Sequence, residues 1–154
     1  MTNPDPTPDT IERPASAPPH ATLDVLLLTF RLQGHLSSLV ATEGRDYGLN
    51  PAEAVSLINL MRGASPVSGV AAAAGIRPNG ASVLVERLRS RNLVQRERSR
   101  RDNRVVTVEL TEAGTQIATK LIERVHDRLR FALAPLLPVE RENLVALLSR
   151  LTDA

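Results

Sequence analysis

The chain has 154 residues, a formal net charge of +2 and no cysteine. This length is typical of a single domain with its own core, and the lack of cysteine excludes disulfides, thiolate zinc sites and thiol-based redox sensing. No apolar run is long enough to span a membrane, and the N-terminus lacks a signal-peptide pattern, so we expect a cytoplasmic protein without membrane contacts.

The first 20 residues hold six of the eleven prolines among Thr, Asp, Ser and Ala, which predicts a disordered tail over 1–20. Residues 21 to about 45 are predicted to be helical because apolar side chains recur at intervals of three and four: Leu23, Leu26, Leu27, Phe30, Leu36, Leu39 and Val40. This apolar stripe is wider than one neighbouring helix needs. We therefore assign 21–47 to the N-terminal helix of a dimerisation region.

Three shorter helices are expected next. Asn50-Pro51 is an N-cap followed by a proline at the first helical position, and this helix should end at Gly63. Ser65-Pro66 repeats the start signal for a helix over 67–74, which Gly75 stops. Pro78 opens another helix over about 78–91. Two helices joined by a turn at Gly75 predict a helix-turn-helix.

A β-hairpin is expected after these helices. Residues 93–97 and 104–110 are predicted to be its two strands, and 98–103 its tip. The alternation of Val106, Val108 and Leu110 puts these three side chains on one face of the second strand. A helix-turn-helix followed by a hairpin is a winged helix. We therefore assign 48–110 to a DNA-binding domain, with its recognition helix over about 78–91 and its wing over about 93–110.

Two helices complete the chain. Thr111 is expected to cap a helix from Glu112 to about Ala134, and a last helix should follow Pro138. We assign 111–154 to C-terminal dimerisation helices, because the first helix and these two carry more apolar surface than a small domain buries. The fold class is thus mainly α with a small β-hairpin wing. A homodimer with interleaved chain ends is expected, and a monomer that folds its ends back is the alternative.

Positive charge is concentrated in one part of the chain. Residues 77–104 contain nine arginines and three acidic residues, a net charge of +6, whereas the rest of the chain sums to −4. A solvent-exposed basic face is one interpretation, since arginine is the usual cation of this chain. The concentration of the excess in one window favours the second interpretation, a nucleic-acid surface.

The wing sequence resembles that of the multiple antibiotic resistance regulator (MarR) family. The resemblance rests on residues 84–96 and on the spacing of Asp102, Arg104, Leu110, Thr111 and Gly114, and the order of elements agrees from about 22 to 152. It implies a homodimeric winged-helix transcription regulator, usually a repressor relieved by a small ligand. It also implies that Arg104 enters the DNA minor groove and that Asp102 holds this arginine in place.

The recognition helix departs from the family pattern, because Gly80 and Val83 stand where polar side chains are expected. Asn79 can bind an adenine edge, Ser82 either kind of base, and Val83 a thymine methyl group. Affinity is therefore expected to rest more on phosphate contacts and the wing than on base edges. The predicted contacts to double-stranded DNA, on a pseudo-palindromic operator, are Arg77, Asn79, Gly80, Ser82, Val83, Arg87, Arg98, Arg100, Arg101, Asp102 and Arg104.

A small, largely apolar effector is expected between the first, second and fifth helices, with Arg31, His35 and Tyr47 as polar contacts. Glu123 and His126 have the spacing of a di-metal helix, but no second copy exists, so we expect no metal. No phosphate-binding glycine loop is present, and neither a cofactor nor an enzymatic activity is expected. The alternatives to a repressor are an activator of the same fold, a winged-helix module for protein contacts and, last, an enzyme.

Overall fold

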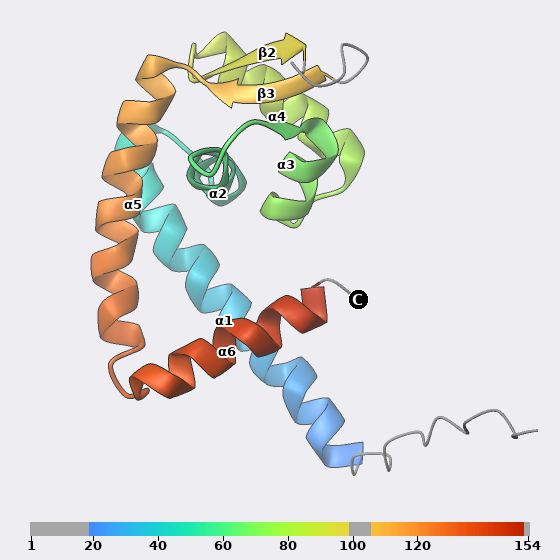
Figure 1. The fold of residues 1–154 in the computed structure, drawn as a ribbon, viewed down its shortest axis with the longest axis vertical. Helices are drawn as coiled ribbons and strands as arrows, with labels where there is room; N and C mark the ends of the chain where they lie inside the picture. The colour runs from blue at the N-terminus through green and yellow to red at the C-terminus, as the bar shows by residue number, and fades with distance from the viewer. Residues whose placement is uncertain (1–18, 99–105, 153–154) are drawn as a thin grey trace, which may run out of the picture. The chain divides into compact units, whose positions relative to one another are not determined.

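The computed structural model describes residues 19–98 and 106–152, which Figure 1 draws as a coloured ribbon, and the predicted tail lies largely outside them. The contacts between residues divide the chain into two compact units, residues 1–35 and 36–154. Helix α1 (Pro19–Gly44) runs through both units and begins within the last two residues of the predicted tail. In the N-terminal unit its large apolar side chains are exposed: Leu23, Val25, Leu26, Leu27, Leu28, Phe30 and Leu32.

The second unit begins with the last turns of α1 and a single 3₁₀ turn, η1 (Arg45–Tyr47). Helix α2 (Pro51–Leu60) then starts at the predicted N-cap. The Asn50 side chain accepts a hydrogen bond from the Glu53 N–H at 2.9 Å, and the Glu53 carboxylate accepts one from the Asn50 N–H at 2.9 Å. This reciprocal capping box provides acceptors for two backbone N–H groups that have no hydrogen-bond partner within the helix.

Ser65 and Pro66 form a short strand, β1 (Ser65–Pro66), where a helix start was predicted. Helix α3 (Val67–Ala74) follows with the predicted bounds, but no side chain caps it. Ser65 pairs with Val108 and Pro66 with Thr107. Proline is tolerated there because β1 lies at the edge of the sheet, where its missing N–H breaks no ladder hydrogen bond. The pairing with a distant strand therefore overrides the local capping signal.

The wing strands are β2 (Val94–Arg98) and β3 (Val106–Leu110), and they pair antiparallel, with Val94 opposite Leu110 and Arg98 opposite Val106. The three strands form one sheet in the order β1-β3-β2. The predicted two-stranded wing is thus extended by β1 at its base.

The remaining helices are α4 (Pro78–Ser90), α5 (Glu112–Ala132) and α6 (Pro138–Thr152). The Thr111 hydroxyl accepts a hydrogen bond from the Gly114 N–H at 3.0 Å, so the predicted cap of α5 is confirmed. None of the described residues of α6 is buried.

The core of the second unit joins α2, α3, α4, α5 and the sheet. Its largest fully buried apolar side chains are Leu57, Val70, Val85, Leu88, Val94, Val108 and Leu121. Since each element contributes at least one of these side chains, the orientation of α4 is fixed by packing from several sides. The mainly helical winged-helix fold predicted from the sequence is confirmed.

Candidate nucleic-acid interface

Helices α3 and α4 form the helix-turn-helix. Gly75 ends α3 in the left-handed conformation, with φ +63°, which costs glycine little and other residues more. The N–H of Ile76 returns to the carbonyl of Ala71 at 3.0 Å, and Pro78 occupies the first turn of α4. These local features set the angle at which α4 leaves the turn.

Helix α4 has one buried face and one exposed face. Ala81, Leu84, Val85 and Leu88 are buried in the core. The predicted contact residues near its start are all exposed: Arg77, Asn79, Gly80, Ser82 and Val83. By helical spacing, Asn79 and Val83 lie opposite the buried face and Ser82 lies beside them. The helix therefore presents these side chains outward while its apolar face anchors it.

Arg87, also predicted to contact DNA, is engaged within the protein. Its Nη2 atom lies 3.1 Å from Oε1 of Glu53, and the two side chains are 59% and 0% exposed. Glu53 Oε1 has no hydrogen-bond partner by angle among the described residues, so the contact is an ion pair without an aligned hydrogen bond. Arg87 thus joins α4 to the capping box of α2, a role that the sequence interpretation missed.

One of the five wing residues predicted to contact DNA lies within the described part of the chain. Arg98, the last residue of β2, pairs with Val106. The other wing residues predicted to contact DNA, Arg100, Arg101, Asp102 and Arg104, lie outside the described residues.

Two neighbouring side chains of α4, Glu86 on its outward face and Arg89 on the flank that faces β2, were not predicted as site residues. Glu86 accepts two hydrogen bonds from Nε of Arg89, at 3.2 and 3.1 Å, and one from Nη2 at 2.6 Å. The hydrogen bonds from Arg89 lower the pKa of the Glu86 carboxyl below its ordinary value, and the charge of Arg96 on β2 adds to this effect. The i, i+3 spacing of the acid and the arginine is the sequence signal by which this pair could have been found.

The η1 turn is held from two helices. Arg91, just after α4, donates from Nη1 to the carbonyl of Gly48 at 3.0 Å and from Nη2 to that of Tyr47. Arg124 of α5 donates to Asp46 at 2.6 Å, and its guanidinium carbon lies 5.6 Å from the centre of the Tyr47 ring. The turn therefore connects α5 with the C-terminal end of α4.

The predicted effector contacts are distributed over the two units. Arg31 and His35 are exposed residues of α1 in the N-terminal unit. Tyr47 is half-buried in η1 of the second unit.

Residues 38–121 match the family described as "Transcriptional regulator SarA/Rot". The chain belongs to the SarA/Rot family of transcriptional regulators. The matched residues run from the last turns of α1 to the middle of α5, so they include the whole winged helix. The members of this family are transcriptional regulators.

Solved structures extend the comparison beyond the matched segment. A probable transcriptional regulator from Pseudomonas aeruginosa is 29% identical, with a TM-score of 0.63, over 82% of this chain and 96% of that one. BpsR of Bordetella bronchiseptica is 27% identical, with a TM-score of 0.70, over 90% of this chain and 99% of that one. The binding of BpsR to DNA is regulated by 6-hydroxynicotinic acid. A MarR-family regulator from Silicibacter pomeroyi shares the fold, with 23% identity and a TM-score of 0.72, over 82% and 86%.

The predicted resemblance to the MarR family is therefore confirmed, and the SarA/Rot family shares this winged helix. No curated protein matches the chain. Among the described helices, none combines the length and apolar composition that crossing a bilayer requires.

Proposed function

We propose that the chain is a homodimeric, sequence-specific DNA-binding repressor of the cytoplasm, which a small-molecule ligand releases from its operator. The observation that carries the proposal is the geometry of α4. Its apolar face is fixed in the core, and its outward face carries Asn79, Ser82 and Val83 within the segment of net charge +6. A helix of this kind enters the major groove, while the arginine-rich tip of the wing reaches the adjacent minor groove.

The apolar surface of the chain ends supports a dimer. Large apolar side chains of α6 are 39 to 66% exposed in the single chain: Val139, Val145, Leu147, Leu148 and Leu151. Seven further apolar side chains of α1 in the N-terminal unit are exposed as well. A second copy would bury these surfaces, and it would present two α4 helices to a two-fold symmetric operator.

Release of the repressor from DNA by a ligand is supported by the similar protein BpsR, because 6-hydroxynicotinic acid regulates the binding of BpsR to DNA. In this chain, Arg31, His35 and Tyr47 are our candidate polar contacts for an effector. A ligand that favours one spacing of the two α4 helices shifts the population away from the DNA-bound state. The Tyr47 carbonyl accepts a hydrogen bond from Arg91 at the end of α4. A ligand that displaces Tyr47 would therefore act on the end of the recognition helix through this hydrogen bond.

The test is a fluorescence-anisotropy titration of a duplex from the protein's own upstream region and of a scrambled duplex, over a series of salt concentrations. We expect tighter binding to the first duplex and a logarithmic affinity that falls linearly with the logarithm of salt. Arg104→Ala should cost about 1–3 kcal/mol on the preferred duplex, and Asp102→Ala less, because it only frees the arginine.

Three further variants distinguish phosphate contacts from base contacts. Arg100→Ala or Arg101→Ala should weaken binding to both duplexes alike, because phosphate contacts carry no sequence information. Ser82→Ala should change the preference between duplexes with a modest loss of affinity. If Arg104→Ala binds like the wild type while Ser82→Ala abolishes binding, the wing-centred mechanism is wrong. A protein that binds no duplex at low salt refutes the proposed function itself.

A further inference from the structure

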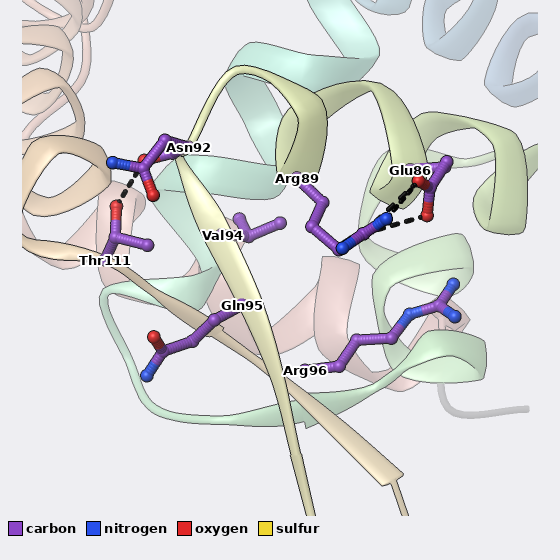
Figure 2. A pocket seen from close by; sticks show the side chains of 7 residues that line it. All are labelled: Glu86, Arg89, Asn92, Val94, Gln95, Arg96 and Thr111. Atoms are coloured by element: carbon purple, nitrogen blue, oxygen red, sulfur yellow. Dashed lines mark hydrogen bonds and ion pairs between the residues drawn. The ribbon is translucent and has the colours of Figure 1, made fainter.

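An open groove of about 510 Å³ lies between the C-terminal half of α4 and strand β2. Its walls include Glu86 and Arg89 from the helix and Arg96 from the strand, with Val94 at its base (Figure 2). One end is closed by Asn92 and Thr111, where the Thr111 hydroxyl donates to the Asn92 carbonyl at 2.6 Å. The groove is therefore a polar site with two arginines, and none of its residues was assigned a role in DNA binding above.

The position of the groove follows from the faces of α4. Glu86 lies three residues beyond Val83 on the outward face, opposite the buried Leu84 and Leu88. Arg89 lies on the flank that faces β2, whereas Arg87 lies on the flank that faces α2 and pairs with Glu53. An arginine thus stands on each side of the outward face. The groove is the flank between that face and the wing.

The charges in the groove are arranged around one carboxylate. Glu86 holds Arg89 through three hydrogen-bond contacts of 2.6 to 3.2 Å, and the Arg89 side chain is nevertheless 55% exposed. Arg96 extends from β2 toward the same pair and is exposed (Figure 2). Without DNA, one negative charge therefore faces two positive ones, and the groove keeps a net charge of +1.

We propose that this groove is a subsite for one phosphate of the DNA backbone, in which Arg89 and Arg96 hold the phosphate and Glu86 is the group that the phosphate displaces. The inference rests on the proposed DNA binding of α4 and the wing. A phosphodiester oxygen and a carboxylate accept the same forked hydrogen bonds from a guanidinium, so the exchange conserves the hydrogen bonds of Arg89. Arg96 supplies the second charge from the opposite wall.

Glu86 has a further consequence for selectivity. It stands on the outward face of α4, so its charge repels the backbone of any duplex that approaches without a good fit. Like charges brought together weaken wrong complexes more than the right one, in which other contacts compensate. We therefore assign Glu86 as a residue that lowers non-specific affinity.

The test measures salt dependence on the preferred duplex. In the double variant Arg89→Gln/Arg96→Gln, the slope of log affinity against log salt should fall by about 0.9, the value for a single phosphate. The matched control, Lys120→Gln/Arg150→Gln, removes two exposed positive charges from α5 and α6 and should leave the slope unchanged. A fall near 1.8 in the groove variant means two separate phosphates and overturns the shared subsite, as does an unchanged slope.

Glu86→Gln provides a second measurement with the opposite sign. We expect its affinity for the scrambled duplex to rise about fivefold, the factor for one unfavourable charge pair at about 4 Å in water. Its affinity for the preferred duplex should rise less, so that selectivity falls. A loss of affinity for both duplexes would mean that Glu86 supports binding, which overturns its assignment.

A free phosphate compound is the other source of the same chemistry. Calorimetric titration of the DNA-free protein with pyrophosphate should give no saturable binding, because an open groove gains little without the contacts of the rest of the duplex. Saturable binding that the double variant loses, together with an unchanged salt slope, would assign the groove to a small anion instead. A wild type that binds no duplex refutes the proposed function, whereas a binding wild type with an unaffected double variant refutes only the subsite.

Discussion

Arg87 Nη2 lies 3.1 Å from Oε1 of Glu53, and this carboxylate is completely buried while the arginine is 59% exposed. The other oxygen of Glu53 accepts the Asn50 N–H in the capping box. The buried carboxylate therefore connects the start of α2 with the last turn of α4. Because a charge without a partner is costly in the interior, the pair also favours the orientation of α4 in which Arg87 reaches Glu53.

Arg87→Met should destabilise the protein by about 1–3 kcal/mol, because it leaves a buried acceptor without its partner. Arg87→Met/Glu53→Gln should regain most of this loss, since a glutamine side chain can keep the capping box without a charge. The measurement is urea unfolding at fixed protein concentration. Arg89→Met is the matched control, because its partner Glu86 is exposed and the change should stay within about 0.5 kcal/mol. Equal losses for Arg87→Met and Arg89→Met would contradict the role of Glu53.

This relationship also marks how far the sequence can predict the site. The Asn50 cap and Pro51 were read correctly, and Glu53 three residues after the cap is the remaining part of a capping-box pattern. Its pairing with Arg87 depends on how α4 packs on α2, and no local pattern carries that information. The same holds for β1, where the local signal for a helix cap was overridden by pairing with β3.

Gly114 was predicted only as part of a family spacing, and the structure gives it a physical role. A Cβ atom at this position would overlap the carbonyl oxygen of Leu93 and lie 2.9 Å from the carbonyl carbon. Gly114→Ala should therefore separate the first turn of α5 from the wing base and cost about 1–3 kcal/mol, as overpacking does. Gly80→Ala is the control, because its Cβ would meet only Ile76 Cδ1, at 3.8 Å. In thermal unfolding this control should gain about 1 kcal/mol, because alanine favours a helix.

The starts of α2, α3, α4 and α5 were predictable because caps and prolines are local features. The end of α2 was not, since this helix stops at Leu60 and was predicted to reach Gly63. The outward face of α4 was predictable from apolar spacing, which is also local, since Leu84 and Leu88 had to face the core. The groove residues Glu86, Arg89 and Arg96 were counted as charge but not as a site. Their arrangement requires the distance between α4 and β2, which only the folded chain defines.

Arg91→Met should loosen the η1 turn. It removes two hydrogen bonds to the carbonyls of Tyr47 and Gly48, and we expect a loss of about 1 kcal/mol in stability. In hydrogen exchange, the Gly48 amide, which donates to the Arg45 carbonyl at 2.9 Å, should exchange faster than in the wild type. Arg62→Met removes an exposed arginine elsewhere and should leave this amide unchanged. Unchanged exchange in Arg91→Met would mean that the turn is held by α5 alone.

Substitutions at Leu147 and Leu148 of α6 test whether this helix forms a subunit interface. They are 55% and 39% exposed in the single chain, so glutamate at both positions should leave the fold of each chain intact. If α6 packs against a second copy, Leu147→Glu/Leu148→Glu places charges in an apolar interface and should halve the mass measured by light scattering at micromolar concentration. DNA affinity should fall with it, because two half-sites require two linked recognition helices.

Val83→Glu, at a 63% exposed position of α4, is the control and should keep the wild-type mass. A monomer mass for the wild type would refute the dimer, and an unchanged mass for the α6 variant would exclude these two leucines from its interface.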